Sequence, residues 1–173
     1  MYLGIDESNH GLSPEIFVGC ITSSYEEVKE ERKSLSKIRG APYSRWKDLL
    51  DVNYKHIIFG WEFREIDPTD YKIIAIGEFA RNFSEQFKIR QIFMDGNIKK
   101  SQLERIMNIL AFVDKDIRLS FGKDLDRKIS LVNKADNVAN LLFHEYVKNK
   151  GREKDKYEKY LIKPDLKDYE RFL

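Results

Sequence analysis

The sequence has few of the residues that build disulfide-stabilised or zinc-binding proteins. Of its 173 residues, one is cysteine (Cys20) and three are histidine. A single cysteine cannot form an internal disulfide, and the histidines at positions 10, 56 and 144 lack the spacing of a zinc site. No apolar run approaches the roughly 18 residues of a membrane-spanning helix, and the first ten residues lack a signal-peptide pattern. These absences predict a cytoplasmic protein with no membrane association.

An excess of charge of one sign is also missing. Lys and Arg total 31 and Asp and Glu total 29, which gives a net charge of +2. Bulk charge therefore does not identify a nucleic-acid partner. The sequence contains no glycine-rich phosphate loop and no Gly-x-Ser-x-Gly motif, so neither ATP binding nor serine-hydrolase chemistry is expected.

What the sequence does contain is an alternation of strand and helix patterns. Apolar and β-branched runs predict strands at 2–6, 16–21, 56–66, 89–94 and 117–121. Apolar stripes predict helices at 24–40, 68–87, 101–110 and 130–147. This order predicts an α/β sheet with parallel pairs, in which the first two strands form an antiparallel hairpin at one edge. We interpret residues 1–148 as one domain and residues 149–173 as a charged C-terminal extension.

Three of the predicted helices carry capping signals at their starts, the first being Ser24 and Glu27 with the spacing of a capping box. Asp67 is suited to the N-cap position of one helix, with Pro68 at its first position. Ser101 and Glu104 have the spacing of a capping box for the next helix. The expected buried stripe of that helix is Leu103, Ile106, Met107 and Leu110.

Acidic residues follow two of the predicted strands. Asp6 and Glu7 end the first strand, and Asp95 ends the strand at 89–94. Reactive groups in open α/β sheets gather at the carboxyl ends of strands. Carboxylates that share a site repel each other unless a cation intervenes, and hard divalent ions prefer oxygen ligands. The pattern predicts a Mg²⁺ or Mn²⁺ site suited to phosphodiester chemistry, although Asp95-Gly96 is also an ordinary turn pair.

Two further acids are candidates for completing this cluster. Asp136 borders the apolar stripe of the last predicted helix, and Asp126 lies in the connection after the strand at 117–121. The alternative for Asp136 is a purely structural charge that complements the helix dipole. The alternative for Asp126 is a solvated loop acid. The residues alone leave both open, and the helix position favours Asp136.

Polar residues near these acids are candidates for substrate binding. Basic side chains follow two of the suspected site strands and would contact phosphates, although such residues more commonly form a solvated surface. The candidates are Asn9, His10, Lys99, Lys100, Arg127 and Lys128.

Three segments resemble a known family. Residues 5–11, IDESNHG, resemble the Asp-Glu-Ala-Gly-Arg-Gly opening of type 2 ribonucleases H, and still more the Asp-Glu-Ser-Gly opening of an uncharacterised ribonuclease-H-like family. Residues 94–96, MDG, are similar to the Val-Asp-Gly of the type 2 enzymes. Residues 126–140 resemble their Asp-Ala-Lys stretch and the helix after it, and KADNVA at 134–139 is similar to the Leu-Ala-Asp-x-x-Ala of the uncharacterised family.

The resemblance implies an α/β fold with a ribonuclease-H-like mixed sheet flanked by helices. It implies that Asp6 and Asp95 lie side by side on central strands, with Glu7 nearby and Asp136 or Asp126 completing the cluster. The implied activity is that of a nuclease that uses Mg²⁺ or Mn²⁺ to hydrolyse phosphodiester bonds of RNA or DNA.

The sequence departs from the type 2 pattern at three positions. Asn9 stands in place of a glycine, His10 in place of an arginine, and Asn140 in place of a lysine. The substrate preference of the type 2 enzymes therefore does not transfer. Two alternatives stay open, namely a catalytically weak or inactive module that binds nucleic acid or protein, and a phosphate-transfer enzyme that acts on small phosphoesters.

Overall fold

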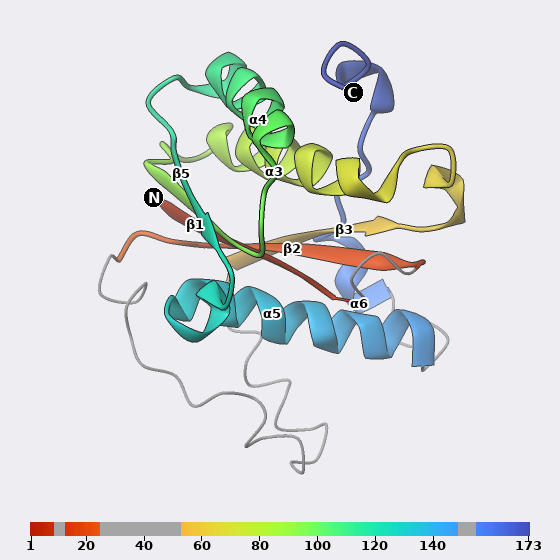
Figure 1. The fold of residues 1–173 in the computed structure, drawn as a ribbon. Coiled ribbons are helices and arrows are strands. Elements are labelled where there is room, and N and C mark those ends of the chain that lie inside the picture. Colours follow the sequence, from red (N-terminus) through yellow and green to blue (C-terminus); the bar gives the residue numbers. More distant parts are fainter. Residues whose placement is uncertain (9–12, 25–52, 149–154) are drawn as a thin grey trace.

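A mixed β-sheet runs through the middle of the molecule (Figure 1). The computed structural model describes residues 1–8, 13–24, 53–148 and 155–173. Within these ranges the sheet has five strands in the order β3-β2-β1-β4-β5. The strands are β1 (Tyr2–Ser8), β2 (Glu15–Thr22), β3 (Asn53–Phe59), β4 (Gln91–Asp95) and β5 (Arg118–Gly122).

The directions of the strands bring four carboxyl ends to the same edge of the sheet. β2 pairs antiparallel with β1 and with β3, whereas β4 pairs parallel with β1 and with β5. The predicted antiparallel pairing of the first two strands is therefore correct, but its predicted place at one edge is wrong. β1 is the central strand of this sheet, and its Leu3 and Ile5 are fully buried.

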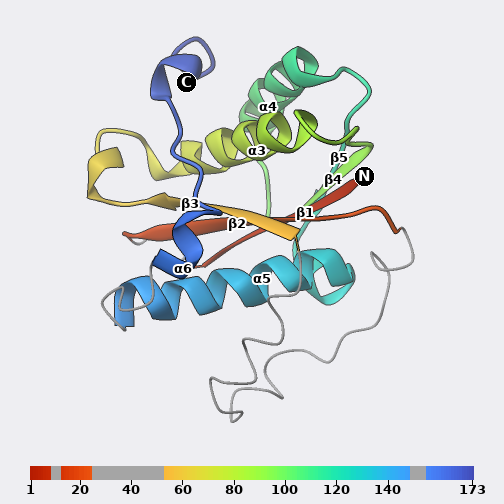
Figure 2. The same cartoon turned by 180° about the vertical axis from the view of Figure 1, so that it is seen from behind.

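Helices cover both faces of the sheet. α3 (Pro68–Ser84) and α4 (Lys100–Val113) lie on one face, and α5 (Ser130–Phe143) lies on the other (Figures 1 and 2). Alternate strand residues point to the two faces. Leu3, Ile5 and Met94 pack in a core with α3 and α4, and Val18 and Phe93 pack in a second core with α5.

Gly4 allows α5 to approach β1 closely. A Cβ atom at residue 4 would lie 2.7 Å from the backbone carbonyl carbon and oxygen of Leu131. Any larger residue would push the first turn of α5 away from the sheet. The glycine therefore sets the separation between β1 and the helix that carries Asp136.

The structure confirms one of the two capping signals predicted for α3 and α4. The Asp67 side chain accepts a hydrogen bond of 2.8 Å from the Thr69 N–H at the start of α3. The predicted capping box of Ser101 and Glu104 is wrong, because α4 already begins at Lys100 and the Lys99 N–H donates to Gln102 Oε1 at 3.0 Å.

Two other predicted patterns require correction. The strand predicted at 56–66 ends at Phe59, because Gly60 leads into the 3₁₀ turn η3 (Trp61–Phe63). Met107 is 42% exposed, because α4 packs through Gln102, Ile106, Ile109 and Leu110, a face rotated from the predicted one. The helix predicted at 24–40 falls mainly on residues outside the described ranges.

Four short helical elements complete the described part of the chain. η4 (Leu125–Arg127) follows β5, and the π-helical turn η5 (His144–Lys148) ends the predicted helix at 130–147. α6 (Asp155–Glu158) and η6 (Leu166–Asp168) lie near the C-terminus. None of the described helices is long and apolar enough to cross a membrane.

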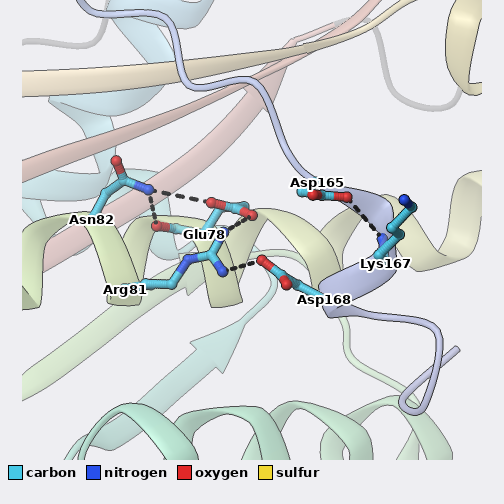
Figure 3. A network of polar contacts seen from close by, with 6 residues as sticks. All are labelled: Glu78, Arg81, Asn82, Asp165, Lys167 and Asp168. Atoms are coloured by element: carbon cyan, nitrogen blue, oxygen red, sulfur yellow. Dashed lines mark hydrogen bonds and ion pairs between the residues drawn. The ribbon is translucent and has the colours of Figure 1, made fainter.

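The C-terminal segment 155–173 contacts β3 of the sheet and helix α3. The His56 N–H donates to the Tyr160 carbonyl at 2.9 Å, and the Ile162 N–H donates to the His56 carbonyl at 2.8 Å, so this segment covers the outer side of β3. Further along, Arg81 of α3 bridges Glu78 and Asp168 (Figure 3). The division of the chain into a domain and an extension stays a prediction.

Candidate functional site

Asp6 and Asp95 lie at the carboxyl ends of two neighbouring parallel strands. The β1–β4 register pairs Tyr2 with Gln91 and continues to Ile5 with Met94. The next residue on each strand is the aspartate, so the two backbones place Asp6 and Asp95 at the same level. Ile5 and Met94 pack in the core on the face covered by α3 and α4. Because successive side chains of a strand point to opposite faces, the aspartates that follow them project toward the α5 face.

Asp6 has a strongly perturbed electrostatic environment. Its residue is 4% exposed. Burial raises the pKa of Asp6 well above its usual range, and the carboxylates of Glu7, Asp136 and Asp95 raise it further, against a lowering by a backbone hydrogen bond. That bond runs from the Glu7 N–H to Asp6 Oδ1 at 2.8 Å. Asp95 of β4 and Asp136 of α5 therefore both act on Asp6 of β1 at this edge.

Asp95 is held by the connection that follows β5. Its Oδ1 accepts hydrogen bonds from the Leu125 N–H and, at 3.3 Å, from the Asp126 N–H. Burial raises the pKa of Asp126, and the Asp95 carboxylate adds to the shift. Asp126 thus lies beside Asp95, whereas Asp136 is the acid from the C-terminal half that acts on Asp6.

Asp136 is half-buried on α5 and is held by Asn140, one turn further along. The Asn140 side-chain amide donates to Asp136 Oδ1 at 2.7 Å and to the Asp136 carbonyl at 2.9 Å. Asn140 stands where the type 2 pattern has a lysine, and in this chain it fixes the orientation of the carboxylate.

Glu7 interacts with the opposite layer of the fold. Its Oε1 lies 2.7 Å from the Lys72 ammonium nitrogen of α3. Sequence reasoning missed Lys72, because a lysine in the second turn of an amphipathic helix has the pattern of an ordinary surface residue. The glycine at position 4 carried a usable signal, since a glycine inside a strand pattern indicates close backbone approach.

The predicted basic residues lie on the surface. Lys99, Lys100, Arg127 and Lys128 are all exposed. Arg127 is the last residue of η4, and its Nη1 lies 3.6 Å from Oδ1 of Asp124, the N-cap residue of the same turn. Lys99 precedes α4, close in sequence to Asp95. The other two candidates, Asn9 and His10, lie outside the described ranges.

The donor set at this edge suits a hard divalent cation. Carboxylate oxygens are the protein ligands that Mg²⁺ and Mn²⁺ prefer. The mutual repulsion that raises the pKa of Asp6 is the repulsion that a shared cation relieves. Among the residues that the structure describes, however, no three or more His, Cys, Asp or Glu side chains form a ready-made metal-binding group.

Comparison with known proteins identifies the fold. No protein-family model and no curated protein matches the sequence. A chain in the structure of the PCNA:RNase HII complex from Archaeoglobus fulgidus is similar, with a TM-score of 0.62, 17% identity, and coverage of 91% of this chain and 77% of that chain. Ribonuclease H2 from Pyrococcus horikoshii OT3 is similar with a TM-score of 0.56, 14% identity, and coverage of 99% and 88%.

These similarities confirm the fold that the sequence motifs implied. The chain has a ribonuclease-H-like α/β fold, with a mixed five-stranded sheet flanked by helices within the described residues. At identities of 17% and 14%, the likeness concerns the fold alone. Function therefore has to be argued from the site.

Proposed function

We propose that the protein is a divalent-metal-dependent nuclease that hydrolyses phosphodiester bonds of RNA or DNA. The observation that carries the proposal is the placement of Asp6 and Asp95 at the ends of adjacent parallel strands, with Asp136 acting on Asp6 from α5. This arrangement occurs on a fold shared with solved ribonucleases HII and H2.

In this proposal Asp6, Asp95 and Asp136 hold Mg²⁺ or Mn²⁺, with Glu7 beside them. When bound, such an ion activates a water molecule and stabilises the negative charge that develops on the phosphate. The chain keeps its ligands oriented through neighbouring groups. The Leu125 and Asp126 N–H groups hold Asp95, and the Asn140 amide holds Asp136. Ligands fixed in this way lose less conformational entropy when the ion binds.

Substrate binding is assigned to the basic residues that follow β4 and β5. Lys99, Lys100, Arg127 and Lys128 are exposed and come after the strands that end at Asp95 and Gly122. Positive side chains at these positions would contact phosphates and hold the strand without reading its sequence. The proposed partner is therefore a nucleic acid.

The proposal is tested by incubating the protein with labelled RNA, DNA and RNA–DNA hybrid in Mg²⁺, Mn²⁺ or EDTA. Cleavage is expected with either metal and is expected to stop in EDTA. Asp6→Asn and Asp95→Asn are expected to reduce cleavage by at least about 100-fold, since outer-shell changes alone cost up to about that factor.

Asp116→Asn is the matched control, because Asp116 is an exposed acid just before β5, at the opposite edge of the sheet. It should cleave at the wild-type rate. Cleavage that continues in EDTA, or full activity in Asp6→Asn, contradicts the proposal.

A second candidate function is a binding module of the same fold with weak or absent catalysis. It is favoured by the Asn140–Asp136 hydrogen bond of 2.7 Å, which occupies a carboxylate oxygen, and by the lack of a ready-made metal-binding group among the described residues. Nucleic-acid binding without a Mn²⁺-induced rise in melting temperature would support this candidate. A rise that disappears in Asp95→Asn would support the nuclease.

A further inference from the structure

Lys72 brings a positive charge to the edge of the sheet where the candidate site lies. Its ammonium nitrogen is 2.7 Å from Glu7 Oε1, and the side chains of Lys72 and Glu7 are 22% and 5% exposed. Solvent and salt screen a pair buried to this extent much less than a surface pair. The ammonium therefore neutralises one carboxylate of the cluster that acts on Asp6.

A second, independent contact locates the same ammonium beside β4. A Cβ atom at residue 96 would lie 2.8 Å from the Lys72 nitrogen, and Gly96 has a φ of +89°. Gly96 directly follows Asp95, so the lysine reaches the ends of both strands that carry the site aspartates. The absence of a side chain at Gly96 leaves the space that the ammonium occupies.

The position of Lys72 is fixed by a rigid element. It lies in the second turn of α3, whose start is capped by Asp67. Its neighbours Tyr71 and Ile73 are 7% and 0% exposed and belong to the core between α3 and the sheet. A side chain carried by a packed helix is held more precisely than one on a loop.

We propose that Lys72 is a positioning residue of the site and acts as its internal counter-cation. It holds Glu7 toward α3 and competes with the divalent ion for the negative charge of the cluster. The inference rests on the proposed metal site and adds a residue that regulates how tightly this site binds the ion. Lys72 keeps the carboxylates compatible with folding before the ion arrives, at the cost of weaker metal binding.

The test is calorimetric titration of Mn²⁺ into the wild type and Lys72→Met, with circular dichroism to check folding. Removal of the neighbouring positive charge is expected to lower the Mn²⁺ dissociation constant by on the order of tenfold. Lys72→Arg retains the charge and should bind Mn²⁺ within about twofold of the wild type. A loss of packing alone would not tighten metal binding, so this readout separates positioning from a structural role.

Lys88→Met is the matched control, because it removes the same charge from an exposed lysine that precedes β4, at the opposite edge of the sheet. It should leave the dissociation constant unchanged. Lys72→Gln is a second neutral variant, used in the same way if Lys72→Met does not fold.

The outcomes distinguish failure of the Lys72 inference from failure of the proposed metal site. One outcome is that the wild type binds Mn²⁺, that Asp95→Asn loses this binding, and that the folded neutral Lys72 variants bind as tightly as the wild type or more weakly. This outcome overturns the role of Lys72 and leaves the metal site standing. Absence of Mn²⁺ binding by the wild type overturns both the metal site and the counter-cation.

Discussion

Asp6 and Glu7 are neighbours on β1, yet they interact with opposite layers of the fold. Asp136 of α5 acts on Asp6, whereas Glu7 Oε1 lies 2.7 Å from the Lys72 nitrogen of α3. Successive side chains of a strand point to opposite faces, so the pair places one carboxylate on each side of the central strand. Removing one or the other is therefore expected to have different consequences.

Asp6→Asn is expected to stabilise the metal-free protein at neutral pH. Burial and the nearby carboxylates raise the pKa of Asp6 in the folded state. The folded state then holds this proton more tightly than the unfolded state, so the free energy of unfolding falls as pH rises above the unfolded pKa of about 4. Asp6→Asn removes this loss of stability at high pH. Its melting temperature near pH 7 in EDTA should therefore be at least about 2 °C above that of the wild type.

The check is a series of thermal melts in EDTA between about pH 4 and pH 8. The gain from Asp6→Asn should shrink toward the acid end of the series. Asp116→Asn, which changes an exposed acid, should follow the wild-type curve. An Asp6→Asn variant with the same pH dependence as the wild type would show that the ionisation of Asp6 does not oppose folding.

Gly4→Ala is expected to destabilise the protein by about 1–3 kcal/mol, the range for overpacking a core. The added methyl would lie 2.7 Å from the Leu131 carbonyl and would force α5 away from β1. Urea denaturation measures the loss. Gly122→Ala is the control, because a Cβ there has no heavy atom within 4 Å, and its effect should stay within about 0.5 kcal/mol. Equal effects at the two glycines would contradict the close α5–β1 contact.

Asn140→Ala is expected to weaken Mn²⁺ binding by about 10- to 100-fold, the usual cost of losing a group that orients a metal ligand. The Asn140 amide donates to Asp136 Oδ1 at 2.7 Å and keeps this carboxylate in one orientation. Titration calorimetry gives the dissociation constants. Asn108→Ala changes an exposed asparagine of α4 and should have no effect. Tighter binding in Asn140→Ala would mean that Asn140 blocks the site instead of orienting it.

Arg81→Met is expected to cost about 2 kcal/mol, more than Asp168→Asn. Arg81 bridges Glu78 on α3 and Asp168 near the C-terminus (Figure 3). Glu78 is 1% exposed and Asp168 is 47% exposed. Loss of Arg81 leaves a buried carboxylate without this cation, which is costly, whereas loss of an exposed partner costs about 1 kcal/mol or less. Urea denaturation of both variants tests the order, and equal losses would contradict it.

The sequence was sufficient to predict the fold class and the neighbouring placement of two aspartates, because both follow from patterns and motifs that are local in the chain. Asp6 and Asp95 each end an apolar strand, and the register then brings them together. The signal for Asp136 was its place at the border of the apolar stripe of a helix, and in the structure its carboxylate raises the pKa of Asp6. The assignment of these residues to a metal site stays a prediction.

Other features could not be predicted because they depend on how separate elements pack. The role of Lys72 requires the separation between α3 and the ends of β1 and β4. The exposure of Met107 depends on which face of α4 meets α3, and a helix with apolar residues on several faces does not specify this. The central place of β1 was implied by the family resemblance but not by the local pattern, because pairing on its second side involves β4, which lies far along the chain.

A crystal structure of the protein soaked with Mn²⁺ tests most directly whether one cation is shared by carboxylates from β1, β4 and α5. We expect an anomalous-scattering peak bounded by oxygen atoms of Asp6, Asp95 and Asp136. Well-ordered carboxylates at this edge with no Mn²⁺ among them, or Mn²⁺ bound only at a different part of the surface, would contradict the account.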